Sequence, residues 1–191
     1  MIVLVNKKKF AKNIAVLLII ILFVTALLNI NNIKKLFYPV DYSFYVEKYS
    51  KEYNLDKYLV YSLIKTESDF DENAVSKKGA KGLMQLMPET ASEYAKKLEI
   101  QNFKENMLFE PETNIRIGCY YISFPLDRYD GDAITAVAAY NAGYGRVDNC
   151  LATEQTDKIS LDIIPFGETK KHIQSFEKNY NNYKKIYAEE R

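Results

Sequence analysis

The segment YLVYSLIKTESDF, Tyr58–Phe70, places a glutamate in line with apolar residues. Val60, Leu63 and Ile64 recur at helical spacing, and Glu67 follows three residues later on the same stripe. A carboxylate is costly to bury without a partner, so the position of Glu67 needs a reason. Held away from water, a carboxyl keeps its proton, as a general acid at a glycosidic oxygen requires. The alternative is a glutamate at the edge of the stripe that caps or pairs locally.

Few other chemistries are open to this chain. A single histidine, His172, gives no zinc cluster of the usual kind, and no serine stands on a nucleophile elbow. No metal or cofactor is predicted. The net charge of +1, from 26 basic and 25 acidic residues, gives no electrostatic case for nucleic acid. Aromatic side chains are abundant, with 16 tyrosines and 10 phenylalanines, and their faces stack on sugars.

The elements that position Glu67 are predicted to be helices, with no convincing strands. Side chains that cap or open helices mark the predicted starts at Asp56, Pro88, Pro111 and Asp132. Gly143 is expected to end the last of these helices. Pro125 is expected to kink or end the helix that contains it.

The N-terminal part contains an uncharged stretch, Ile14–Ile30, in which only Thr25 and Asn29 are polar. Its length of about 17 residues is at the lower limit for a transmembrane helix, and we predict an uncleaved signal-anchor over 14–30. The rival prediction is a cleaved signal peptide, because Val24–Ala26 loosely resembles a small-residue cleavage site. A buried helix is disfavoured because the stretch has no polar face.

Lysines around this stretch predict its orientation. Four precede it and two follow it closely: Lys7, Lys8, Lys9, Lys12, Lys34 and Lys35. The positive-inside bias then places residues 1–13 in the cytoplasm, 31–41 as a linker, and a folded domain over 42–191 outside the cell membrane. An oxidising compartment permits a disulfide, but nothing forces Cys119 and Cys150 together, and two unpaired thiols are favoured.

The residues after Glu67 carry a family resemblance. TESDFDENAVSKKGAKGLMQLMPETA, Thr66–Ala91, closely resembles the signature of the soluble lytic transglycosylase family, relatives of goose-type lysozyme. NIRIGCYY at Asn114–Tyr121, AAYNAGYGRV at Ala138–Val147 and IPFGETKKHI at Ile164–Ile173 resemble its later motifs in the same order. The resemblance implies an all-α, lysozyme-like helical domain with a substrate cleft, and makes 42–191 a lytic transglycosylase catalytic domain.

The resemblance also implies a mechanism, in which Glu67 is the only catalytic acid/base. Glu67 protonates the oxygen between N-acetylmuramic acid and N-acetylglucosamine in peptidoglycan, and then takes a proton from the C6 hydroxyl of the same muramoyl ring. That hydroxyl attacks C1 and leaves a 1,6-anhydro end. One carboxylate suffices because the nucleophile is already held near C1, whereas a hydrolase ordinarily needs a second.

The other motif residues transfer by resemblance to substrate binding. Ser76, Gln85 and Met87 match positions that contact the sugar and its N-acetyl group. Tyr140 matches a tyrosine beside the acid, and Asn141 also faces the site.

One position departs from the family pattern. His172 stands where a cleft tyrosine is common. We include it among the substrate-binding residues, where it keeps a polar contact or adds pH sensitivity at about pH 6 to 7. The alternative is an inert surface residue.

Peptidoglycan glycan strands are the implied partner, together with a membrane contacted by the N-terminal helix. The chain is predicted to be a single-pass protein of the bacterial cell membrane with an extracytoplasmic domain. Two other functions stay open. One is a hydrolytic muramidase, and the other is a non-catalytic peptidoglycan-binding scaffold in a cell-envelope protein complex.

Overall fold

The computed structural model describes residues 7–165 and 167–187 and divides the chain into two units, Met1–Pro39 and Val40–Arg191. Each unit is described by itself. The first six residues of the predicted cytoplasmic segment, and residues 188–191 at the end of the predicted domain, lie outside the described residues.

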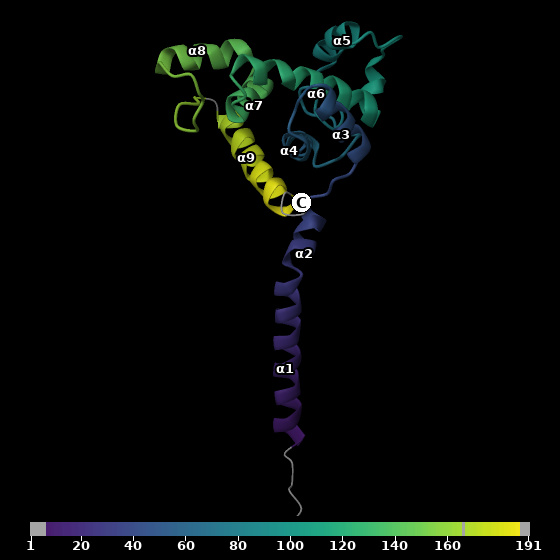
Figure 1. Ribbon diagram of the computed structural model, residues 1–191, viewed down its shortest axis with the longest axis vertical. Helices are drawn as coiled ribbons and strands as arrows, with labels where there is room; N and C mark the ends of the chain where they lie inside the picture. The colour runs from purple at the N-terminus through teal and green to yellow at the C-terminus, as the bar shows by residue number, and fades with distance from the viewer. Residues whose placement is uncertain (1–6, 166, 188–191) are drawn as a thin grey trace, which may run out of the picture. The chain divides into compact units, whose positions relative to one another are not determined.

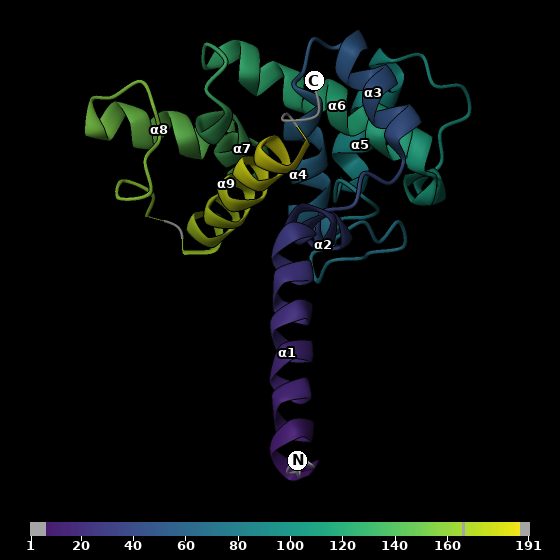
Figure 2. The ribbon, with the colours of Figure 1, turned by 60° about the horizontal axis from the view of Figure 1, so that its bottom comes forward.

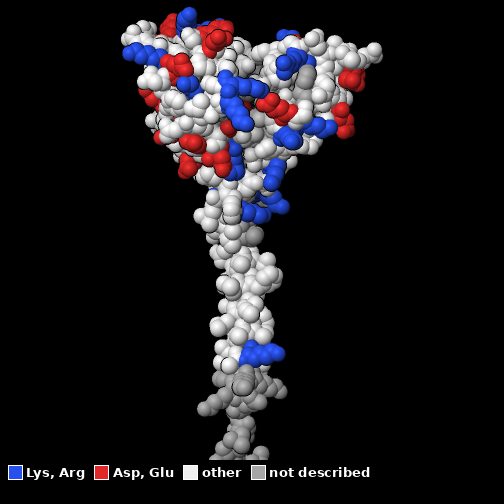
Figure 3. Space-filling model, turned by 180° about the vertical axis from the view of Figure 1, so that it is seen from behind, with Lys and Arg blue, Asp and Glu red and all other residues white. Residues whose placement is uncertain are grey.

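The first unit consists of two helices, α1 (Lys7–Leu28) and α2 (Ile30–Phe37). Consecutive apolar side chains from Val16 to Val24 are 45–70% exposed, so they surround α1 on every side. Figure 3 shows this described stretch as almost entirely uncharged. Within 7–165 and 167–187, none of the helices combines the length and the apolar character that crossing a membrane requires. The stretch 31–41, predicted as a linker, is largely occupied by α2.

The second unit is built from helices joined by loops (Figure 1). In chain order they are α3 (Ser43–Glu52), α4 (Lys57–Ser68), α5 (Pro88–Lys97), the short 3₁₀ helix η1 (Glu105–Phe109), α6 (Pro111–Arg128), α7 (Ala133–Ala142), α8 (Tyr144–Glu154) and α9 (Gly167–Tyr187). In the described part of the chain, extended pairing is limited to two isolated bridges, in which Lys81 pairs with Val75 and with Leu86. The predicted all-helical fold is confirmed.

The predicted helix ends are also confirmed. The carboxylates of Asp56 and Asp132 each accept a hydrogen bond from a backbone N–H in the first turn of their helices, at 2.9 and 2.8 Å. Pro88 and Pro111 are the first residues of α5 and α6. Gly143 ends α7 with a φ of 87°, a left-handed conformation that glycine adopts without strain.

Two further expectations have different outcomes. Pro125 does not end its helix, because α6 continues to Arg128. The backbone N–H of Tyr129 donates to the carbonyl of Pro125 at 3.0 Å, so helical hydrogen bonding continues after the proline, which lacks only its own N–H donor. Cys119 and Cys150 are free thiols, as favoured, with Cys119 fully buried.

Helix α4 lies at the centre of this unit and packs against α9 and α3 (Figure 2). Its stripe of Val60, Leu63 and Ile64 is completely buried. The rings of Tyr61 on α4 and Tyr183 on α9 stack with centroids 5.7 Å apart. Burying each such apolar side chain contributes about 1.5–3 kcal/mol, so α9 holds α4 firmly along its length.

Candidate active site

Glu67 lies in the last turn of α4, one residue before the helix ends at Ser68. Asp69 and Phe70 both have left-handed backbone conformations, with φ of 52° and 68°. The carboxyl side chain of Glu67 is 12% exposed and borders a cavity. The helix therefore presents a largely buried acid at the point where the chain turns away.

This cavity has a volume of about 590 Å³. Its walls are formed by Glu67, Ser76, Lys77, Lys78, Ala80, Gln85, Leu86, Met87, Thr90, Tyr121, Tyr140, Asn141, Ala142, Arg146, Glu168 and Thr169. All the predicted site residues except His172 are among them. A second cavity of about 610 Å³, bordered by Tyr53, Tyr120 and Tyr180, contains none of the predicted site residues. The predicted residues therefore select the cavity beside Glu67.

The loop between α4 and α5 forms one wall of this cavity, and a buried amide on α6 fixes it. Asn114 is completely buried and donates hydrogen bonds to the carbonyls of Lys81 (3.0 Å) and Leu108 (2.7 Å). Its Oδ1 accepts a hydrogen bond from the backbone N–H of Met84 at 2.8 Å. One side chain thus satisfies three backbone groups that helices or strands would otherwise satisfy.

A glycine allows the loop to approach this amide. Gly82 has a φ of 73°, and a Cβ there would collide with the carbonyl of Leu108 and the side-chain amide of Asn114. Gly79 is different, because a Cβ there would meet no atom within 4 Å. Its φ of 89° shows that conformation, rather than close approach, requires glycine at that position.

Gln85 and Ser76 shape the loop as well as bordering the cavity. Gln85 adopts a left-handed conformation, with φ of 46°, and its Nε2 donates to the carbonyls of Ala74 (3.1 Å) and Gly82 (2.9 Å). The hydroxyl of Ser76 accepts a hydrogen bond from the backbone N–H of Ala80 at 3.0 Å. Both side chains hold the wall in its conformation.

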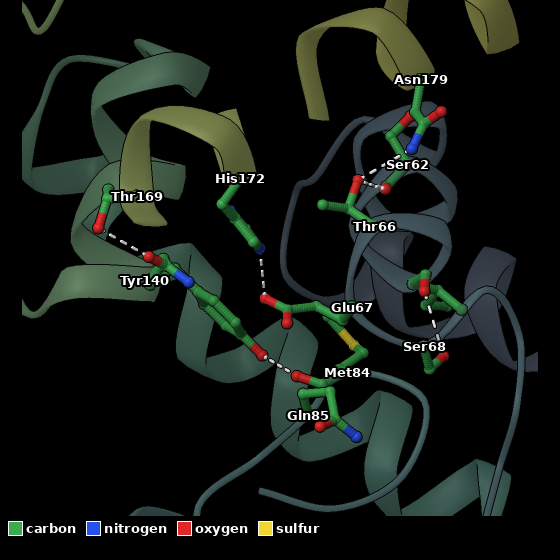
Figure 4. A network of polar contacts seen from close by, with 12 residues as sticks. Ser62, Thr66, Glu67, Ser68, Met84, Gln85, Tyr140, Thr169, His172 and Asn179 are labelled. Atoms are coloured by element: carbon green, nitrogen blue, oxygen red, sulfur yellow. Dashed lines mark hydrogen bonds and ion pairs between the residues drawn. The ribbon is translucent and has the colours of Figure 1, made fainter. Parts of the chain in front are cut away.

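Tyr140 lies beside the acid and donates its hydroxyl to the carbonyl of Met84 at 2.7 Å (Figure 4). Its ring centroid is 4.8 Å from that of Tyr121, which gives the cavity an aromatic wall. Burial raises the pKa of Tyr140 well above its ordinary value, and the nearby Glu67 carboxylate raises it further. Tyr140 is therefore a neutral donor that anchors the loop.

Asn141 and Met87 occupy the more open part of the cavity. The side-chain oxygen of Asn141 accepts a hydrogen bond from the hydroxyl of Thr169 at 2.9 Å, joining the end of α7 to the start of α9. Met87 is 42% exposed, so its thioether is available at the rim.

His172 contacts the acid itself. Its Nε2 lies 2.9 Å from Oε1 of Glu67, and the two side chains are 11% and 12% exposed (Figure 4). The family resemblance predicted a cleft position for His172, because a tyrosine is common there. Nothing in the sequence indicated that His172 pairs with Glu67. The contact joins α9 to α4 behind the cavity wall.

Several residues of the cavity were not selected from the sequence. Tyr121, Thr169 and Arg146 lie inside the motif segments quoted above. Their membership of those segments was the sequence feature that could have indicated them. Lys78 and Glu168 were also missed, and they form an exposed ion pair with Nζ 3.0 and 2.9 Å from the two carboxylate oxygens. This lysine holds the pKa of Glu168 below its usual range.

The second unit is an all-helical domain in which one largely buried glutamate borders a cavity with an aromatic wall. This architecture is lysozyme-like. A family model described as Transglycosylase SLT domain matches residues 44–163, and the chain belongs to this family. The soluble lytic murein transglycosylase of Salmonella typhimurium is 32% identical over 142 residues, which are 72% of this chain and 22% of that relative. The chain therefore spans about a fifth of the length of this relative.

Two further similarities also cover only part of each relative. Membrane-bound lytic murein transglycosylase C of Yersinia pestis is 29% identical over 164 residues, covering 72% of this chain and 46% of that relative. The crystal structure of the 70 kDa soluble lytic transglycosylase of Escherichia coli superimposes with a TM-score of 0.73 at 29% identity, covering 78% of this chain and 25% of that one.

Proposed function

We propose that this chain is a peptidoglycan lytic transglycosylase in which Glu67 is the single acid/base. Glu67 protonates the oxygen between N-acetylmuramic acid and N-acetylglucosamine as the bond from that oxygen to C1 breaks. The C6 hydroxyl then bonds to C1 and returns its proton to Glu67. The products are a 1,6-anhydromuramoyl end and a free sugar hydroxyl, so no water and no cofactor are consumed.

The observation that carries this proposal is the isolation of the Glu67 carboxyl. It is the one largely buried carboxyl among the described residues that border the cavity. Contact with the cavity gives it access to a sugar oxygen, which a general acid must reach. Tyr121 and Tyr140 add aromatic faces of the kind that stack on sugar rings.

Hydrolysis is the second candidate, because Glu168 also borders the cavity. A hydrolase would need such a carboxylate to activate water or to form a covalent intermediate. Both oxygens of Glu168 contact Lys78, and the side chain is 75% exposed. An ion-paired, solvated carboxylate is a weak base, which favours the transglycosylase.

The released products test the proposal directly. Muropeptides released by the chain should end in 1,6-anhydromuramic acid, one water lighter than hydrolysis products by mass spectrometry. Digestion in heavy-oxygen water should leave no label at C1, because water never attacks that carbon. Labelled reducing ends that disappear in Glu168→Gln would instead establish hydrolysis. Binding to peptidoglycan without any product would indicate a scaffold.

We also propose that the first unit anchors the protein at the bacterial cell membrane, with the second unit on the outer side. The support is the unbroken run of apolar side chains from Val16 to Val24, which would be removed from water by lipid. The name of the Yersinia pestis relative describes that protein as membrane-bound.

Fractionation tests the anchor. The full-length protein should stay with membranes after a high-salt wash, while a chain beginning at Pro39 should remain in the supernatant. Salt removes proteins held by surface charge and leaves those held by apolar burial. A mature N-terminus near Leu27 would identify a cleaved signal peptide and overturn the proposal.

A further inference from the structure

We propose that His172 is a positioning residue for Glu67. In this inference a neutral imidazole donates its Nε2–H to Oε1 of Glu67 and leaves Oε2 to carry the catalytic proton. The inference rests on the proposed acid/base function of Glu67. It starts from the 2.9 Å contact between two side chains that lie 105 residues apart in the chain.

Polar contacts on α9 aim the imidazole from both sides. Thr169 and Asn179 lie three residues before and seven residues after His172, which places all three on one face of the helix. Thr169 donates its hydroxyl to Asn141 on α7 at 2.9 Å. Asn179 donates its amide to the hydroxyl of Thr66 on α4 at 3.0 Å. The face that carries His172 is therefore fixed to α7 and α4, two of the helices that border the cavity.

The hydrogen bonds open to the two ring nitrogens of His172 favour one form of the imidazole. Nδ1 of His172 is buried and has no hydrogen-bond partner among the described residues. A bare nitrogen at Nδ1 leaves one acceptor unpaired, whereas a proton there would bury an unpaired N–H. The imidazolium would have that proton and would also hold Glu67 as a carboxylate, without the proton that the acid step requires. The neutral form protonated at Nε2 avoids both costs.

The surrounding charges are compatible with this neutral form. Burial raises the pKa of Tyr140, so its hydroxyl stays protonated. Glu168, one turn before His172 on α9, is exposed and paired with Lys78. The buried polar residues of the described ranges are all uncharged: Ser50, Ser62, Asn114, Thr135, Thr169 and Asn179.

As a consequence, the two carboxyl oxygens of Glu67 have different roles. Oε1 is engaged by the imidazole, and Figure 4 draws no contact from the other oxygen. Oε2 then donates its proton to the glycosidic oxygen and receives one from the C6 hydroxyl, which restores the starting form. Holding one oxygen fixes the orientation of the other, and a misplacement of about 1 Å can cost on the order of 100-fold in rate.

Nuclear magnetic resonance tests the tautomer without depending on turnover. His172 is the only histidine in the chain, so ¹⁵N-histidine labelling of the full-length protein, without a histidine tag, reports one imidazole. We expect a protonated Nε2 and a bare Nδ1 near neutral pH, and a shift of the Nε2 resonance in Glu67→Gln. A proton on Nδ1, or an Nε2 resonance unaffected by Glu67→Gln, would overturn the inference.

Kinetics of three variants test the positioning role. His172→Phe keeps a ring but removes the donor, and should lower kcat by about 10- to 100-fold with KM nearly unchanged. His172→Gln keeps an N–H donor near the position of Nε2 and should recover most of that loss. Ile173→Val is the control, since it trims the neighbouring buried side chain on α9 at a typical cost of about 0.5–1.5 kcal/mol in stability.

The outcomes separate the inference from the proposed function. Equal kcat in His172→Phe and the parent would refute the positioning role while leaving Glu67 as the acid/base. Equal losses in the Phe and Gln variants would refute the role of the donor. A parent protein without turnover would refute the proposed function, and the tautomer measurement would still decide whether His172 donates to Glu67.

Discussion

Replacing the acid in Glu67→Gln should lower the release of peptidoglycan fragments by about 10²- to 10⁴-fold, the usual effect of losing a positioned general acid/base. The amide has nearly the same shape as the carboxyl but carries no transferable proton. Because its oxygen can still accept a hydrogen bond from His172, the fold and the binding of glycan strands should persist. The measurements are the initial rate of muropeptide release, cosedimentation with peptidoglycan, and the thermal unfolding midpoint.

A matched control is available on another helix. Glu93→Gln changes an exposed glutamate of α5 that pairs with Lys97 at 2.7 Å and does not border the cavity. This variant should release fragments at the parent rate, since an exposed pair contributes about 0–1 kcal/mol to stability. Parent-like turnover in Glu67→Gln would show that the assignment of the acid is wrong.

Replacing the buried amide in Asn114→Ala should cost about 3 kcal/mol or more of unfolding free energy. The substitution leaves the N–H of Met84 and the carbonyls of Lys81 and Leu108 without their partner, and each buried unpaired group costs about 1–3 kcal/mol. Denaturant unfolding followed by circular dichroism measures this loss. Activity should fall more than the folded fraction does. The reason is that the backbone carbonyl of Met84 also accepts a hydrogen bond from the hydroxyl of Tyr140, beside the acid.

Asn149→Ala provides the comparison for this prediction. Asn149 is exposed on α8, and its replacement should change the unfolding free energy by less than about 0.5 kcal/mol. If the two alanine variants were equally stable, the buried amide would not be what holds the loop.

The helices could be predicted because their signals are local. Asp56 and Asp132 cap helices through hydrogen bonds to residues two or three positions away, and the stripe that contains Glu67 repeats within a single helix. Pro125 shows the limit of such signals, since a residue known to break helices lies inside α6 without ending it.

The site could be predicted only as far as the motif residues carried it. Asn114 stood inside a quoted block, but its contact with Met84 spans 30 residues and depends on how α6 packs beneath the loop. His172 was placed near the substrate, while its partner proved to be Glu67. Which of several buried polar groups pair with one another is decided by tertiary packing, and no local spacing encodes it.

The long separation between the paired groups has a consequence for folding. Glu67 enters the site on α4, its wall is fixed from α6, and His172 arrives on α9 near the end of the chain. Contacts between distant segments form late, because loop closure must precede them. A nascent or partly folded chain therefore has an acid but no assembled site. Catalytic competence should appear only with the final docking of α9, which makes activity a reporter of complete folding.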